Sequence, residues 1–248
     1  KRIIAPIFIL MSAVVVGQNS SFDQVSLNVS FTSPNRILSV DLDKDGDEDF
    51  LVTSDDNSVD WLVNNGSNVF SKTTLFTLSG ASDIKAVDLD NDSDLDIVAT
   101  GSTAIHVYRN ISSTFSFLQE IVISGGSRIE VADISGDQVP DLISSSSSAA
   151  VMSWWVNTGS GTFSTQTSTP AGSAARDLQV IDIDGDNDND IIASFSGSME
   201  LYTNQGSGSF VEANLDNLGS YQQFDVMDVD GDGDFDIVSI IANQVILL

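Results

Sequence analysis

The chain has 248 residues, of which 36 are acidic and 9 are basic, giving a formal net charge of −27. A surface this acidic repels phosphate backbones and anionic headgroups, so we expect binding to neither nucleic acid nor a membrane surface. With 41% hydrophobic residues and no cysteine, the composition is that of a folded protein without disulfide bonds.

The N-terminal residues have the pattern of an export signal. Two basic residues precede the apolar run IIAPIFILMSAVVVG, which is short for a membrane-spanning helix. Gly17 suits cleavage before Gln18. We therefore expect residues 1–17 to be a signal peptide and the mature domain, 18–248, to be secreted or held at the cell surface without a membrane span. The alternatives are a buried first strand or a membrane anchor.

The rest of the chain repeats one acidic motif of nine residues. The five copies read DLDKDGDED, DLDNDSDLD, DISGDQVPD, DIDGDNDND and DVDGDGDFD, and they begin at Asp41, Asp88, Asp133, Asp182 and Asp228. The period is therefore 45 to 49 residues. Periods of this length are typical of solenoids, propellers and repeat arrays.

Each copy lies among short apolar runs in a fixed order. In the first unit ILSV precedes the motif, FLVTS follows it, VDWLVNNG comes third, and a fourth run begins at Phe70. Short runs rich in Val, Ile and Phe, bounded by Gly, Asn and Ser, are strands. The motif is then the hairpin between the first and second strands of a four-stranded unit. We place the units at about 36–83, 84–127, 128–175, 176–221 and 222–248.

Four strands per unit is the pattern of a propeller blade, so we expect an all-β chain folded as a β-propeller of four-stranded blades. The last unit has only three runs, and residues 22–31 supply a fourth, because Phe22 precedes Asp41 by the distance that separates Phe163 from Asp182. We predict a five-bladed ring closed by this N-terminal strand. The alternative is that the repeats form part of a seven-bladed ring.

The acidic motifs predict metal sites. In each hairpin the side chains at positions 1, 3, 5 and 9 converge, and the backbone carbonyl at position 7 joins them. Hard oxygen ligands in this number suit Ca²⁺, whereas Mg²⁺ requires stricter octahedral geometry. Gly46, Asn187 and Gly233 at position 6 permit the positive φ of a sharp turn.

We expect four or five Ca²⁺ sites, and the third is the weakest because it replaces one aspartate by Ser135 and has Val139 at position 7. The second has Ser93 where glycine would ease the turn. The predicted metal-site residues are Asp41, Asp43, Asp45, Asp47 and Asp49; Asp88, Asp90, Asp92, Asp94 and Asp96; Asp133, Ser135, Asp137, Val139 and Asp141; Asp182, Asp184, Asp186, Asp188 and Asp190; and Asp228, Asp230, Asp232, Asp234 and Asp236.

A D-x-D-x-D-G-x-x-D hairpin in every blade resembles the FG-GAP/VCBS repeats of integrin-α-like β-propellers. The stretches NTGSGTF and NQGSGSF are similar to the same repeats. The resemblance implies a Ca²⁺ ion in each loop, on the face opposite the face that binds ligand in integrin-like propellers.

The sequence favours a binding function over catalysis. His106 is the only histidine, cysteine is absent, and no G-x-S-x-G motif occurs, so we expect no enzyme. We expect an adhesion or ligand-binding module for a glycan or an extracellular protein. The alternatives are a scaffold module of a larger surface protein and a carbohydrate-active enzyme of the lyase type.

Three further features bear on binding. Trp154 and Trp155 offer rings that stack on sugars, although one of them is expected to pack between blades. The run SSSSS at 144–148 has the composition of a loop without evident chemistry. Five residues before each motif comes a ring of mixed charge near the mouth of the channel: Arg36, Asp83, Arg128, Asp177 and Gln223.

Overall fold

The apolar runs form strands and the acidic motifs form the hairpins between them. The computed structural model describes residues 27, 29–66, 69–148, 151–164, 167–170, 175–216, 219, 221–241 and 244–248. All regular elements in these ranges are β-strands, and within them no helix is long and apolar enough to cross a membrane. The predicted signal peptide lies outside the described residues.

The strands group into five antiparallel sheets, in which each strand pairs with its neighbours in the sequence. The sheets are β1 (Pro34–Val40), β2 (Asp49–Ser54), β3 (Ser58–Asn64) and β4 (Phe70–Thr77); β5 (Asp83–Val87), β6 (Asp96–Thr100), β7 (Ala104–Ile111) and β8 (Thr114–Val122); β9 (Gly126–Ala132), β10 (Asp141–Ser146), β11 (Val151–Trp155) and β12 (Thr167–Pro170); β13 (Asp177–Ile181), β14 (Asp190–Ser194), β15 (Met199–Asn204) and β16 (Phe210–Asp216); and β17 (Tyr221–Met227), β18 (Asp236–Ile241) and β19 (Gln244–Leu247).

The five acidic hairpins share one register. The residue before the motif always pairs with the aspartate at position 9, as Val40 does with Asp49 and Met227 with Asp236. Because the register is identical, corresponding side chains of the five loops occupy equivalent places. The remaining pairs are Val87 with Asp96, Ala132 with Asp141, and Ile181 with Asp190.

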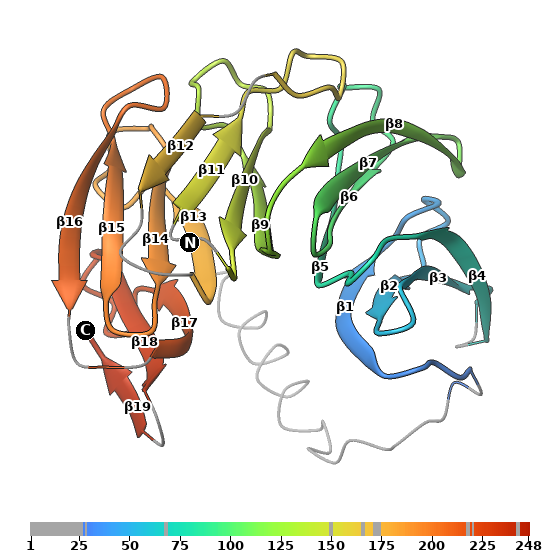
Figure 1. Ribbon diagram of the computed structural model, residues 1–248, viewed down its shortest axis with the longest axis horizontal. Helices are drawn as coiled ribbons and strands as arrows, with labels where there is room; N and C mark the ends of the chain where they lie inside the picture. The colour runs from blue at the N-terminus through green and yellow to red at the C-terminus, as the bar shows by residue number, and fades with distance from the viewer. Residues whose placement is uncertain are drawn as a thin grey trace, which may run out of the picture.

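The sheets follow one another around an arc, from β1–β4 to β17–β19 (Figure 1). The first strands of successive sheets, β1, β5, β9, β13 and β17, contact each other in that order. Arg36 of β1 and Gln223 of β17 line the same central cavity, so the first and last sheets both reach the middle of the molecule. The arrangement is propeller-like.

Closure by residues 22–31 stays a prediction. Residues 22–26 and 28 lie outside the described ranges, and the described residues of this segment belong to no strand. Ser30 and Phe31 lie beside β4: Lys72 Nζ donates to the Ser30 carbonyl at 3.3 Å and lies 4.4 Å from the centre of the Phe31 ring. Within the described residues β19 pairs only with β18, and no closed ring is seen.

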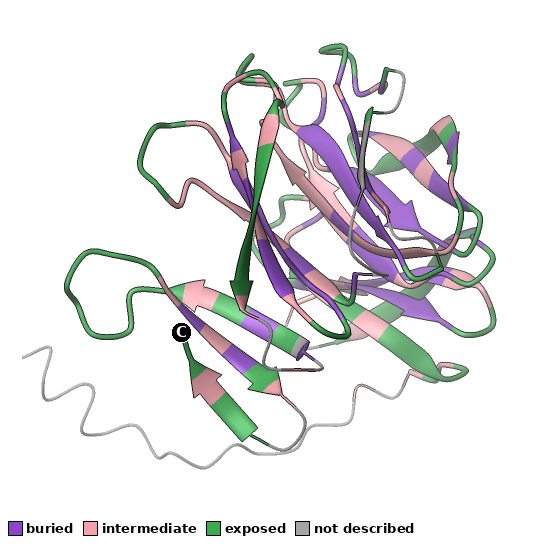
Figure 2. Cartoon of the chain, turned by 60° about the vertical axis from the view of Figure 1, so that its left-hand side comes forward, coloured by how far each residue is buried: buried purple, intermediate pink, exposed green. Residues whose placement is uncertain are grey.

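The core lies between the sheets and is centred on the second strands. All five residues of β6 and of β14 are buried, whereas the outer strands β16 and β19 are mostly exposed (Figure 2). On β6, Ile97 packs in the cluster shared with the first sheet and Val98 in the cluster shared with the third. A strand covered on both faces reads as a continuous apolar run, as these do.

Candidate metal loops and central cavity

The loops turn sharply at two positions. Position 6 has a positive φ in all five copies, as predicted for Gly46, Asn187 and Gly233: Gly46 at 94°, Ser93 at 74°, Gln138 at 66°, Asn187 at 72° and Gly233 at 98°. Position 4 is also left-handed in every copy, including Lys44 at 61° and Asn91 at 60°, which the sequence analysis missed. Side chains with a Cβ adopt this region at a cost, so the backbone is strained where these positions are not glycine, as at Lys44 and Ser93.

Backbone N–H groups hold the carboxylates inside the turn. In the fourth loop the Asn187 N–H donates to Asp182 Oδ2 at 3.0 Å, and the Asp188 N–H donates to Asp186 Oδ1 at 2.9 Å. The same two bonds, from position 6 to position 1 and from position 7 to position 5, recur in the other four loops. Each loop is therefore a preformed ring of oxygens.

Four of the five loops bring three carboxylates together, with oxygens within 4.8 Å of one another. The groups are Asp41, Asp43 and Asp45; Asp88, Asp90 and Asp96; Asp182, Asp184 and Asp190; and Asp228, Asp230 and Asp236. In the first two loops Asp41 Oδ1, Asp88 Oδ1 and Asp90 Oδ1 are buried without a hydrogen-bond partner. Buried, unpaired anionic oxygens are costly unless a cation neutralises them. The donor set fits a divalent cation that prefers oxygen.

The aspartate at position 9 ties each of the first four loops to the end of the third strand of its sheet, where it accepts the N–H of Asn64, Asn110, Asn157 or Asn204. Asp96 Oδ2 accepts the Leu89 N–H at 3.1 Å, and its Oδ1 accepts the Asn110 N–H at 2.8 Å. Burial nevertheless raises the pKa of Asp96 to about 6, with further contributions from the charges of Asp90 and Asp92. Burial raises the pKa of the equivalent Asp141 and Asp190 as well.

The third loop satisfies its own carboxylates. Asp141 Oδ2 accepts both the Ile134 N–H at 3.0 Å and the Ser135 N–H at 2.8 Å. Asp133 accepts three backbone N–H groups of its own turn. Within the described residues the loop forms no cluster of three carboxylates, because position 3 is Ser135. Its place as the weakest calcium site stays a prediction.

The remaining predicted residues lie in the loops without joining a cluster. They are Asp49 of the first loop and Asp92 of the second, Asp186 and Asp232 at position 5 of the fourth and fifth loops, and Asp47, Asp94, Asp188 and Asp234 at position 7.

Two basic side chains from outside the second loop form ion pairs with its aspartates. Arg109 Nη2 lies 2.8 Å from Asp90 Oδ2, and Lys44 Nζ, from the first loop, lies 2.7 Å from Asp94 Oδ1. The hydrogen bond from Lys44 lowers the pKa of Asp94, assisted by the Ser112 N–H. The two ion pairs offset part of the negative charge of this loop.

Asparagines at the ends of the third strands connect neighbouring sheets through the loops. Asn157 Nδ2 donates to the Leu89 carbonyl of the second loop at 2.9 Å, and Asn204 Nδ2 donates to the Ile134 carbonyl of the third loop at 2.9 Å. Both side chains are almost fully buried. Sequence reasoning gave these residues no role, although an asparagine recurs at this place in the first four units as Asn64, Asn110, Asn157 and Asn204.

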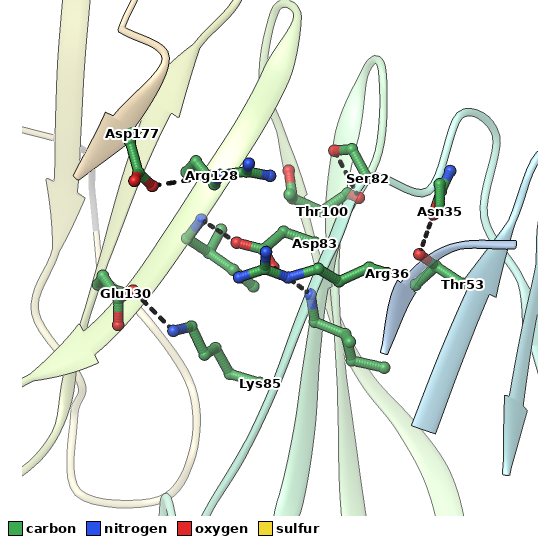
Figure 3. A network of polar contacts seen from close by, with 12 residues as sticks. Asn35, Arg36, Thr53, Ser82, Asp83, Lys85, Thr100, Arg128, Glu130 and Asp177 are labelled. Carbon is green, nitrogen blue, oxygen red and sulfur yellow. Dashed lines mark hydrogen bonds and ion pairs between the residues drawn. The ribbon is translucent and has the colours of Figure 1, made fainter. Parts of the chain in front are cut away.

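Salt bridges line the central cavity, which has a volume of about 230 Å³. Arg36 Nε lies 2.9 Å from Asp83 Oδ1, and Arg128 Nε lies 3.5 Å from Asp177 Oδ1 (Figure 3). Each pair joins the first strand of one sheet to that of the next. The predicted ring of mixed charge is therefore a set of contacts between sheets, with Gln223 also lining the cavity.

A third salt bridge joins the first strands of the second and third sheets. Lys85 Nζ lies 2.6 Å from Glu130 Oε1 (Figure 3). Burial raises the pKa of Glu130, and the charge of Lys85 opposes the shift. Burial likewise raises the pKa of Asp177 against the charge of Arg128.

The remaining candidate residues are packing residues. Trp154 packs in the cluster between the third and fourth sheets and Trp155 in the cluster between the second and third. His106 has a side chain 17% exposed, and its ring packs edge-on against Phe117. The serines 144–146, expected in a loop, form the buried end of β10.

Solved structures with this fold belong to proteins of diverse kinds. An Agrocybe aegerita lectin that recognises non-reducing terminal N-acetylglucosamine is 22% identical, with a TM-score of 0.57 over 83% of this chain and 60% of its own. The Vibrio cholerae biofilm matrix protein Bap1 is 18% identical, with a TM-score of 0.52 over 88% of this chain and 37% of its own. BBS1N, from a complex with ARL6DN, is 11% identical, with a TM-score of 0.54 over 86% of this chain and 78% of its own.

At these identities the likeness concerns the fold alone. The chain spans less than two thirds of the length of the lectin and of the biofilm protein. No curated protein matches the sequence. A family model described as the FG-GAP-like repeat matches residues 41–98, 88–144, 133–193 and 182–239, so that each match runs from one acidic motif into the strand after the next. These overlapping matches cover most of the chain, which belongs to the FG-GAP-like repeat family.

Proposed function

We propose that the chain is a secreted or cell-surface calcium-binding module that binds a glycan or an extracellular protein. Calcium binding is supported by the four carboxylate clusters. Those of the first and second loops contain buried carboxylate oxygens without a hydrogen-bond partner. In the family, repeats of this kind often bind calcium, and this supports the assignment.

The residues that would hold the ions are the clustered aspartates of the first, second, fourth and fifth loops. A bound Ca²⁺ would supply the positive charge that offsets their mutual repulsion. The chain's own residues prepare the site: left-handed residues set the turn, and backbone N–H groups orient the carboxylates. Because asparagines of the next sheet hold the second and third loops, ordering a loop also orders a junction between sheets.

The ligand-binding part rests on the kind of protein that shares the fold. A lectin and a biofilm matrix protein support a role in recognition at a surface. A scaffold role in a longer surface protein is the second candidate. It is favoured by exposed apolar side chains on the first and last sheets, among them Ile37 at 62% and Val245 at 71% exposed. We propose no catalytic activity.

The calcium part is tested by calorimetry in calcium and in EGTA, with elemental analysis of the purified protein. Bound calcium and a higher melting temperature in calcium are expected, because an ion that binds only the folded state stabilises it. A protein without calcium and with the same melting temperature in both buffers would refute it. Glycan and surface-protein arrays test the ligand part, and binding to neither class would favour the scaffold role.

A further inference from the structure

The second acidic loop differs from the other loops in the side chain that lies beside it. Arg109, the residue before the buried Asn110 at the end of β7, reaches back to this loop and forms an ion pair with Asp90. Counting from the buried asparagine, the equivalent residues of the first, third and fourth sheets are Val63, Val156 and Thr203. Of these four sheets, only the second therefore has a positive charge at this place.

The strand register makes this comparison between sheets exact in position. Ile97, which follows the last aspartate of the second loop, pairs with the residue before Arg109. Ile191 pairs in the same way with the residue before Thr203 in the fourth sheet. Equal register places residue 203 against the fourth loop as Arg109 lies against the second. Among the described residues, no basic side chain forms an ion pair with the aspartates of the fourth or fifth loop.

Arg109 uses one oxygen of Asp90 and leaves the other free. Its Nη2 lies 2.8 Å from Asp90 Oδ2, and the Asp90 side chain is only 11% exposed. Asp90 Oδ1 is buried without a hydrogen-bond partner, and Asp90 offers an oxygen to the cluster that it forms with Asp88 and Asp96. One carboxylate is thus shared between the guanidinium and the candidate metal site. A cation held by this cluster is repelled by the guanidinium, and the repulsion is strong where little water screens it.

Arg109 is also tied to the neighbouring sheet. Its Nη2 donates to the Ser160 carbonyl in the turn between β11 and β12. Asn157, just before that turn, donates to the Leu89 carbonyl of the second loop at 2.9 Å. Moving the guanidinium away from the loop therefore breaks contacts on both sides of the junction between the second and third sheets. Lys44 adds another positive charge to the same loop.

We propose that Arg109 sets the calcium affinity of the second loop by acting as a fixed positive charge that competes with the ion for Asp90. This inference rests on the proposed calcium-binding function and assigns control of one site to one residue. The second loop then binds calcium more weakly than the fourth, where Thr203 takes the place of the arginine. It also keeps its shape without calcium, because the guanidinium already offsets part of the repulsion among its carboxylates.

The test needs a separate signal from each loop, which two backbone amides supply. The Ser93 N–H donates to Asp88 Oδ2 at 2.9 Å, and the Asn187 N–H donates to Asp182 Oδ2 at 3.0 Å. Their NMR signals are followed in the whole protein at a series of buffered free calcium concentrations. In the wild type, the concentration that half-saturates the Ser93 signal should exceed the one that half-saturates the Asn187 signal.

Two variants move the charge in opposite directions. Arg109→Met removes the charge and keeps a long side chain, so it should lower the half-saturating calcium concentration at Ser93 about tenfold and leave that at Asn187 unchanged. Thr203→Arg should raise the value at Asn187 about tenfold and leave that at Ser93 unchanged. Lys85→Met, the control, removes a positive charge beside the central cavity and should change neither value. In EGTA, the Ser93 amide should exchange with solvent faster in Arg109→Met than in the wild type.

The proposal is overturned if Arg109→Met leaves calcium binding at Ser93 unchanged or weakens it, because Arg109 would then only support the shape of the loop. An unchanged titration at Asn187 in Thr203→Arg would overturn it independently, even if Arg109→Met did not fold. In both cases a calcium-dependent shift of the Asn187 signal in the wild type leaves the calcium-binding function standing. If no loop signal responded to calcium in the wild type or in Arg109→Met, that function and this proposal would fail together.

Discussion

Replacing Asn204 by alanine should destabilise the protein more than the same replacement of Asn110, which occupies the equivalent place in the second sheet. The Asn204 side chain is fully buried and makes four hydrogen bonds. Its Nδ2 donates to the carbonyls of Ile134 and Asn189, and its Oδ1 accepts the N–H groups of Gly206 and Gly208. At about 1 kcal/mol for each bond, the loss is about 4 kcal/mol.

A matched comparison lies within the chain. Asn110 occupies the same place in the second sheet, but its Nδ2 makes one hydrogen bond, to Leu95 O, and its Oδ1 has no partner. Asn110→Ala should therefore cost only about 1 kcal/mol. The exposed Ser116→Ala on β8 serves as the control and should change stability by less than about 0.5 kcal/mol.

Urea unfolding in saturating calcium measures the three variants, and thermal unfolding checks them. For a domain of this size, about 4 kcal/mol corresponds to a fall in melting temperature of roughly 8–16 °C. If Asn204→Ala and Asn110→Ala lost equal stability, the additional bonds of Asn204, including the one to Ile134 of the third loop, would contribute nothing. The account of sheets joined through their loops would then be wrong.

Three other outcomes are expected. Asp182→Ala should release more calcium than Asp133→Ala in equilibrium dialysis, because Asp182 belongs to a three-carboxylate cluster whereas Ser135 leaves the third loop without one; equal losses would contradict the ranking of sites. Lys85→Met should cost about 1–2 kcal/mol at pH 7, because it leaves Glu130 half-buried without its cation. The folded-state pKa of Glu130 is raised, so this loss of stability should shrink as the pH falls towards 4.5, the ordinary pKa of glutamate, because the carboxyl group then becomes protonated in both the folded and the unfolded state. If urea unfolding showed the same loss at pH 7 and at pH 4.5, the charge of Glu130 would not be its cause. Deleting residues 18–31 should speed amide exchange in β19 if that segment closes the last sheet, and unchanged exchange would place the closing strand elsewhere.

The repeat made the architecture predictable from the sequence. Five motifs at a spacing of 45 to 49 residues fix both the strand order and the register, because the residue before each motif must pair with its last aspartate. The positive φ at Gly46 and Asn187 followed from residue type, whereas that at Lys44 did not, since lysine gives no such signal.

Side-chain contacts between distant repeats were beyond sequence reasoning. Ser144 and Ser146 lie in a strand because the hairpin register carries β10 past them, and tertiary context overrides their weak strand propensity. The asparagine bridges join residues about 70 positions apart, such as Asn204 and Ile134. A conserved spacing within each repeat identified these asparagines as equivalent, but only the packing of one sheet on the next revealed their partners.

The charges around the central cavity alternate in sign, and the number of sheets decides whether that alternation can be complete. Around the cavity the equivalent positions read positive, negative, positive, negative and neutral, from Arg36 through Asp83, Arg128 and Asp177 to Gln223. Strict alternation closes on itself only in a circle with an even number of members; in an odd one, two like charges must meet. A neutral glutamine in the fifth place, lining the same cavity as Arg36, removes that conflict, so five members can meet without a repulsive junction.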